Sequence, residues 1–217
     1  MGYKDRVIYK TLNMEKLREK SEYEGNPVGL SKTTATAMAK ELDRHLSSFI
    51  TLFNQYHKHH WMVEGPQFRD LHLFFEDHYT QLHEQYDAIA ERLTVMGYCP
   101  TCHPAKQIEL SYIAHEAEGV FRIREMLKKD MEDEKTIAVE LRKSIKLAFE
   151  HEDFATKALL EGILIKTEDR CHHIEHFLGE DGLSIGLIAT PEDIMEEEDK
   201  KSKGQNGKAK ATRKAKV

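Results

Sequence analysis

The stretch Phe68–Met96, FRDLHLFFEDHYTQLHEQYDAIAERLTVM, decides the fold because it contains neither proline nor glycine and is typical of one long helix. At 3.6 residues per turn, it spans about eight turns. Its large apolar side chains fall on one stripe of a helical wheel, which is the pattern of a core-facing surface. These side chains are Leu71, Phe75, Leu82, Tyr86, Ile89 and Leu93.

A neighbouring stripe of the same helix carries residue types that bind metals. Its members are His72, Glu76, His83, Asp87 and Glu91. His72 and Glu76 are four residues apart, as are Asp87 and Glu91, so each pair is a plausible two-ligand unit. The two pairs are separated by about 22 Å along the helix and cannot share one metal. An ordinary solvated polar face is the alternative interpretation.

The positions of the two pairs are symmetric about the middle of the helix, near Gln81 and Leu82. If two copies of the helix ran antiparallel across a two-fold axis at that point, the His72 pair of one copy would face the Asp87 pair of the other. His72 would then oppose Glu91, and Glu76 would oppose Asp87. The spacing therefore predicts an isologous dimer with two identical sites, each built from both chains.

Composition favours an all-helical protein. The chain has 217 residues, of which 32% are charged and only five are proline. This length suits one sizeable domain with tails. There is no apolar run of membrane-spanning length, and the first ten residues, MGYKDRVIYK, lack the apolar core of a signal peptide. We therefore expect a cytoplasmic protein without a membrane partner. Three cysteines argue against a disulfide framework.

The order of the segments predicts an antiparallel four-helix bundle with a short element between the second and third helices. We expect an N-terminal arm over residues 1–31 and a four-helix domain over residues 32–179. Ser31 is a credible N-cap and Gly179 a suitable C-terminal glycine. The four helices are expected at about 32–62, 68–96, 119–150 and 153–178, and the short turn or helix at 108–115.

Charge is segregated at the C-terminal end. Thr190–Asp199 contains six acidic residues and no basic one, whereas Lys200–Val217 contains eight basic residues and no acidic one. Removing those eight positive charges from the net charge of −6 leaves −14 over residues 1–199. We interpret residues 180–199 as an acidic linker and Lys200–Val217 as a disordered basic tail suited to contacting phosphates without reading bases.

His60 and Trp61 lie at the end of the first helix, and the break at Gly65-Pro66 lets the chain reverse. His60 can therefore approach the His72 end of the second helix. The resulting imidazole and carboxylate set suits Fe(II), Mn(II) or Zn(II). The pattern His60-Trp61-x3-Gly65-x6-His72-x3-Glu76-x10-Asp87-x3-Glu91-Arg92 resembles the signature of Dps proteins, the mini-ferritins of bacteria and archaea.

This resemblance covers roughly residues 33–178 and implies a ferritin-like fold. It further implies a homo-oligomer, a hollow dodecamer with di-iron ferroxidase centres at two-fold interfaces. Fe(II) would be oxidised, preferentially by hydrogen peroxide, and stored as a ferric mineral core. The family's ligands map onto His60, His72, Glu76, Asp87 and Glu91. Glu76 is a departure, because this position is more often aspartate, and its longer side chain can shift the metal.

The basic tail also agrees with the resemblance, since lysine-rich tails in this family are associated with non-specific DNA binding. The protein would then be nucleoid-associated and protect DNA from oxidative damage. Twelve tails on one shell would strengthen a weak contact by avidity. Two alternatives stay open: an architectural DNA-binding shell whose metal site is structural or vestigial, and an unrelated helical adaptor. The tail itself could also serve only to solubilise the shell.

Other possible sites are weaker. An iron site inside each bundle needs Glu-x-x-His pairs, and the sequence offers only Asp169-x-x-His172. Cys99-Pro-Thr-Cys102-His103 matches a c-type haem attachment pattern and half of a zinc site. Its missing zinc ligands could come from His103 and from the cluster Cys171, His172, His173 and His176. A plain loop with two free thiols is the alternative. By family position, Glu150, Glu152 and Asp153 are candidates for an iron-entry pore.

Overall fold

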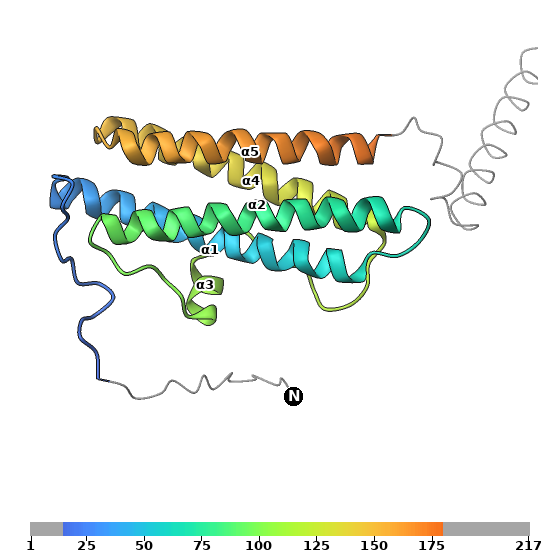
Figure 1. Ribbon diagram of the computed structural model, residues 1–217, viewed down its shortest axis with the longest axis horizontal. Coiled ribbons are helices and arrows are strands. Elements are labelled where there is room, and N and C mark those ends of the chain that lie inside the picture. Colours follow the sequence, from blue (N-terminus) through green and yellow to red (C-terminus); the bar gives the residue numbers. More distant parts are fainter. Residues whose placement is uncertain (1–14, 180–217) are drawn as a thin grey trace, which may run out of the picture.

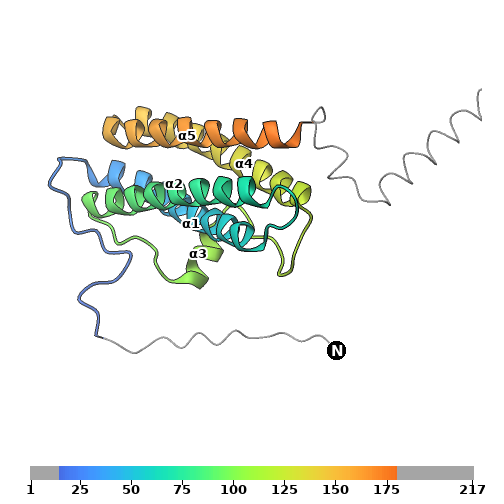
Figure 2. The ribbon, with the colours of Figure 1, turned by 45° about the vertical axis from the view of Figure 1, so that its right-hand side comes forward.

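The computed structural model describes residues 15–179, and within this range the chain forms five α-helices and no strand. They are α1 (Lys32–Met62), α2 (Phe68–Val95), α3 (Pro104–Leu110), α4 (Ile123–Glu150) and α5 (Phe154–Leu178). Helices α1 and α2 pack along each other, and so do α4 and α5. Figures 1 and 2 show these pairs as two layers, with α3 beside α1. The predicted all-α bundle is confirmed.

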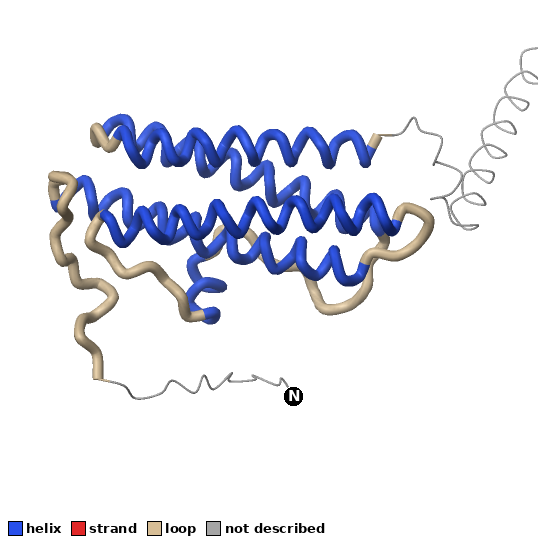
Figure 3. Tube along the Cα trace, in the orientation of Figure 1, coloured by secondary structure: helices blue, strands red, loops and turns tan. Residues whose placement is uncertain are grey.

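Two helix boundaries differ from the predicted ones. Helix α3 begins at Pro104, earlier than expected, because proline lacks the N–H that a first-turn residue leaves unpaired and His103 caps the N–H of Ala105 at 3.2 Å. Helix α4 begins at Ile123 rather than near residue 119, since Gly119 has φ +129° and interrupts helical geometry. Figure 3 shows the long connection that these changes leave between α2 and α4.

The helix ends follow local chemistry. Ser31 is the N-cap of α1 and accepts the N–H of Thr34 at 3.0 Å, as predicted. Helix α5 ends before Gly179, also as predicted, but Gly179 has φ −51° and does not adopt the left-handed conformation usual for a C-terminal glycine. The left-handed residue is instead Glu152, with φ 57°, in the tight turn between α4 and α5.

The apolar stripe of α2 faces the core. Leu71, Phe75, Leu82, Ile89 and Leu93 are each at most 1% exposed. Burying one such side chain stabilises the fold by about 1.5–3 kcal/mol. The sixth residue of the stripe, Tyr86, lies on the flank of the core and contacts Phe53 edge to face at 5.6 Å. The core face therefore fixes the rotation of α2 and turns its polar stripe away from the bundle interior.

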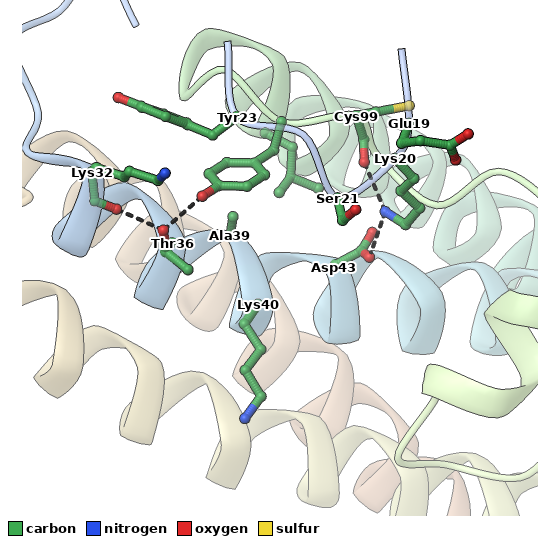
Figure 4. A pocket seen from close by; sticks show the side chains of 12 residues that line it. Glu19, Lys20, Ser21, Tyr23, Lys32, Thr36, Ala39, Lys40, Asp43 and Cys99 are labelled. Carbon is green, nitrogen blue, oxygen red and sulfur yellow. Dashed lines mark hydrogen bonds and ion pairs between the residues drawn. The ribbon is translucent and has the colours of Figure 1, made fainter. Parts of the chain in front are cut away.

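The arm before α1 lies against the bundle. Lys20 forms an ion pair with Asp43 at 2.9 Å and donates to the carbonyl of Cys99 at 2.7 Å (Figure 4). The turn after α2 contains Gly97 at φ +83°, where a Cβ would collide with the backbone of Gly25. Residues 1–14 and 180–217, including the predicted acidic linker and basic tail, lie outside the described range. Within residues 15–179, no helix is long and apolar enough to cross a membrane.

Candidate metal centre

His60 and His72 face each other across the α1–α2 contact. Their rings stack with centroids 3.6 Å apart and planes 22° apart. The Nδ1 of His60 donates to the carbonyl of His72 at 2.9 Å, and the Nδ1 of His72 donates to the carbonyl of His60 at 2.8 Å. A carbonyl can only accept, so each Nδ1 carries a proton, and Nε2 is the nitrogen of each ring that is left to bind a metal.

The end of α1 makes this exchange possible. His60 lies in the last turn of α1, where backbone carbonyls have no partner within the helix. The chain then turns through Gly65, at φ +100°, and Pro66, which brings the start of α2 alongside. The side chain of His72 donates a hydrogen bond to the otherwise unpaired carbonyl of His60. The turn therefore fixes both the tautomer and the direction of the two imidazoles.

The remaining predicted ligands lie farther along α2. Glu76 follows His72 by one turn, a rise of about 6 Å, and is partly exposed. Asp87 and Glu91 are exposed on the same helix, about 22 Å and about 28 Å along it from His72. No cluster of three or more histidine, cysteine or acidic side chains within residues 15–179 is placed to hold one metal. One chain thus brings together His60 and His72, with Glu76 one turn further along α2, but not Asp87 and Glu91.

Aromatic side chains surround the histidine pair. Trp61 is 67% exposed and stacks on His57 with ring centroids 4.9 Å apart. His57 also contacts Tyr79 at 4.1 Å, and Tyr79 in turn lies edge-on to His60 at 5.3 Å. Burial and the nearby charge of His60 lower the pKa of His57. His57 is therefore a packing residue, and Trp61 presents an apolar surface beside the candidate centre.

The bundle interior contains a different polar cluster, centred on Arg170. This guanidinium is fully buried and binds both oxygens of Glu134, at 2.5 and 3.1 Å. It also donates to the side-chain oxygen of Gln85 at 3.0 Å and to Thr167 at 3.2 Å. Tyr56 donates to Glu134 at 3.0 Å. A fixed cation at this depth repels a metal and occupies the carboxylate that would bind it.

A second part of the interior cluster joins α1 to α4. Gln55 donates to Asp130 at 2.8 Å and to Asp133 at 2.9 Å. The Nδ1 of His59 lies 2.8 Å from Asp130, and its Nε2 lies 3.1 Å from Glu116. Burial lowers the pKa of His59, but the two carboxylates outweigh it and hold the pKa above its ordinary value. The interior carboxylates are thus bound by protein groups.

The alternative bundle-interior site is not formed by the pair that suggested it. The side chains of Asp169 and His172 are 54% and 64% exposed and lie on the outer surface of α5.

The three residues predicted to line an iron-entry pore differ in exposure. Asp153 is buried, binds Arg92 at 2.7 Å and caps α5, so it is not available to line a pore. Glu150 and Glu152 are exposed.

The two cysteines that follow α2 lie far from the cysteine on α5. Cys99 and Cys102 are exposed free thiols after α2, and Cys171 is a partly buried free thiol on α5. The start of α5 lies at the Cys99 end of α2, because Arg92 binds Asp153 there. Cys171 is about 25 Å farther along α5. The structure therefore does not bring the predicted zinc ligands together.

Comparison with known proteins agrees with this architecture. A family model described as a ferritin-like domain matches residues 39–183. The nutrient stress-induced DNA-binding protein of Synechococcus sp. is 42% identical over 165 residues, which cover 76% of this chain and 94% of that protein. The DNA protection during starvation protein of Halobacterium salinarum is 38% identical over 142 residues, covering 65% and 78% of the two chains.

Among solved structures, an archaeal Dps homologue from Halobacterium salinarum matches with a TM-score of 0.76 at 34% identity. The match covers 79% of this chain and 96% of the other. The fold and the matched family model define a ferritin-like protein. The chain belongs to the Dps family of these proteins. The five predicted ligands do not converge within one described chain, and their assignment as one site stays a prediction.

Proposed function

We propose that the protein is a ferroxidase and iron-storage protein. It oxidises Fe(II) with hydrogen peroxide at di-iron sites shared by two subunits and stores the ferric product in a hollow dodecamer. The observation that supports this best is the exchange of Nδ1–H bonds between His60 and His72, which leaves the Nε2 atoms of both rings to bind a metal one helical turn from Glu76. The complementary carboxylates, Asp87 and Glu91, are exposed where a partner subunit can reach them.

The residue types fit the substrate. Imidazole nitrogen and carboxylate oxygen suit Fe(II), and few ligands per metal leave open positions for an oxidant. Two Fe(II) ions give one electron each to hydrogen peroxide, which takes up two protons and becomes two water molecules. A two-electron reduction releases no hydroxyl radical, so it removes both reactants that damage DNA. The two carbonyl-bound histidines keep the site in one geometry throughout.

The basic tail adds DNA binding to this proposal. Lys200–Val217 lies outside the described residues, and its eight positive charges are a property of the sequence. The name of the Synechococcus relative describes that protein as DNA-binding. We infer that the tail contacts DNA phosphates without sequence preference and that the protein acts in the cytoplasm, on the nucleoid. Such binding weakens steeply as salt rises.

The iron reaction is tested by mixing Fe(II) and peroxide with the wild type and with His72→Ala plus Glu76→Ala. The double variant should lose most of the oxidation rate above the protein-free background. Glu84→Gln is the matched control, because Glu84 is an exposed carboxylate on α2 outside the candidate site. Equal rates in the wild type and the double variant, with the same oligomer size, would refute the site assignment.

The DNA proposal is tested by gel shifts at low and high salt with the full chain and with a chain ending at residue 199. We expect the truncated protein to bind more weakly and with a smaller salt dependence. Unchanged binding after truncation would contradict the role of the tail. DNA binding together with no iron oxidation in the wild type would instead favour an architectural shell.

A further inference from the structure

A second pair of histidines lies near the end of α5, on the outer surface of the bundle. His172 and His176 are four residues apart and therefore face the same way. Their Nε2 atoms approach to 3.1 Å, with ring centroids 4.4 Å apart and planes 73° apart. Both rings are exposed. The pair thus presents two converging imidazole nitrogens on a rigid helix.

The separation of the two nitrogens fits a shared metal ion. Imidazole nitrogens bind zinc at about 2.0–2.1 Å. Two such bonds at a right angle place the nitrogens about 2.9 Å apart, and a tetrahedral angle places them about 3.3 Å apart. The observed 3.1 Å lies between these values. The pair therefore needs no rearrangement of the helix to hold one ion.

The Nε2–Nε2 contact is a hydrogen bond in which one ring donates, so a metal ion that binds both nitrogens displaces that proton. The Nδ1 of His172 lies 3.9 Å from an oxygen of Glu175, beyond hydrogen-bond distance. Neighbouring groups do not compete for the position. His173 lies edge-on to His78 at 6.2 Å on the side of α5 that faces α2. Cys171 is partly buried, and it does not form a group of three possible metal ligands with the two histidines.

The pair is distinct from the candidate iron centre. Helix α5 approaches α2 through contacts of His173 with His78 and of Phe177 with Phe74, at 4.8 Å. His72 instead bonds across to α1. The two histidine pairs therefore lie on different sides of α2. They also differ in donor set, since the α5 pair is formed by imidazoles alone.

We propose that His172 and His176 form a binding site for a divalent transition-metal ion that prefers imidazole, such as Cu²⁺, Ni²⁺ or Zn²⁺. No third histidine, cysteine or acidic side chain within residues 15–179 completes the site, so water fills the remaining positions. Two imidazoles favour Cu²⁺ most strongly, according to the usual order of divalent metal affinities. Mg²⁺ and Ca²⁺, which prefer oxygen ligands, are excluded.

Cu²⁺ is the probe for the test, and copper bound per chain is measured by equilibrium dialysis of the full-length oligomer. We expect His172→Gln plus His176→Gln to bind one Cu²⁺ fewer per chain than the wild type. In the His60→Ala plus His72→Ala background, the same two replacements should also remove the nitrogen splitting of a two-imidazole centre from the EPR spectrum. His173→Gln is the matched control and should keep both. Equal copper binding and equal spectra in the wild type and the double variant would overturn the proposal.

A second background separates this site from the iron centre. His60→Ala plus His72→Ala removes the imidazoles of the candidate iron half-site, and the α5 copper should persist in that variant. Loss of all bound copper there would contradict an independent site on α5. Because His172 and His176 are exposed, their replacement should leave the oligomer size unchanged, which gel filtration checks.

Discussion

The outer face of α2 and the interior of the bundle both carry histidines and carboxylates, but they use them in opposite ways. Inside, Glu134 is bound on both oxygens by Arg170, and Asp130 accepts from Gln55. Outside, Asp87 and Glu91 are exposed, and His60 and His72 bind only backbone carbonyls. The same residue types are thus part of the fold in one region and open to a ligand in the other.

This difference shows why residue type alone does not define a metal site. A carboxylate whose oxygens are already bound in a dry interior gives up those bonds only at a large energetic cost. An exposed carboxylate gives up only water. Interior changes should therefore alter stability and outer changes should alter iron chemistry.

The largest expected effect is on stability. Arg170→Leu leaves Glu134 buried without its charged partner and should lower the free energy of unfolding by about 3–5 kcal/mol. Urea unfolding of the intact oligomer measures this change. Arg142→Leu is the matched control, because Arg142 pairs with Glu168 at 2.6 Å on the surface, and it should cost less than about 1 kcal/mol. Equal losses in both variants would contradict the contrast between interior and surface.

A double variant sharpens this prediction. Arg170→Met together with Glu134→Met removes both charges, so no uncompensated ion stays buried. Much of the stability lost in Arg170→Leu should return. If the double variant is less stable than the single one, the loss comes from packing and not from the unpaired charge.

The next effect is a pH dependence from buried His45. Its nitrogens lie 2.7 Å from the Tyr112 hydroxyl and 2.8 Å from the Ser144 hydroxyl. Burial, with the charge of Arg44 adding to it, lowers the pKa of His45 from 6.5 to about 4. The unfolded chain therefore binds a proton that the folded chain excludes. The stability from this group is complete above about pH 6.5 and is lost as pH falls toward 4.

Between pH 7 and pH 5, the contribution of His45 to the free energy of unfolding should fall by about 2 kcal/mol. His45→Gln should remove this part of the pH dependence, although it also lowers stability at pH 7. Urea unfolding at the two pH values gives the comparison. The same pH dependence in the variant and the wild type would show that His45 is not held neutral.

The smallest effect on stability is expected at the outer carboxylates. Asp87→Asn plus Glu91→Gln should change the free energy of unfolding by less than about 0.5 kcal/mol, because both side chains are exposed. Iron oxidation by peroxide should nevertheless fall as it does in His72→Ala plus Glu76→Ala. A stable variant with the wild-type oxidation rate would remove these two residues from the proposed site.

Much of the fold was predictable because it depends on local patterns. The apolar stripe of α2, the Ser31 cap and the Gly65-Pro66 break each act within a few residues. The start of α3 was missed although Pro104 gave a usable signal, since proline is favoured in a first helical turn. The approach of His60 to His72 could also be predicted, because only the chain reversal at Gly65-Pro66 separates their two helices.

The interior cluster could not be predicted from the sequence. Gln55 and Asp130 are 75 positions apart, and Gln85 and Arg170 are 85 apart. In sequence, the charged run around Asp130 and Glu134 resembles a solvated helix face, and only tertiary packing buries it. His59 was likewise unrecognised as part of this cluster. The four-residue spacing of His172 and His176 is apparent in the sequence. Only the structure shows that this pair lies far from Cys99 and Cys102, with which it was grouped as a possible zinc site.

The central claim is that each iron site needs two chains, and subunit complementation tests it most directly. One variant lacks the histidine half-site (His60→Ala, His72→Ala, Glu76→Ala), and the other lacks the carboxylate half-site (Asp87→Ala, Glu91→Ala). Each alone should be inactive. Co-assembled at equal amounts, they should regain peroxide-dependent Fe(II) oxidation at about a quarter of the wild-type rate, since half of random dimers are mixed and each holds one intact site. No recovery in mixed oligomers, or full activity in either variant alone, would contradict a shared site.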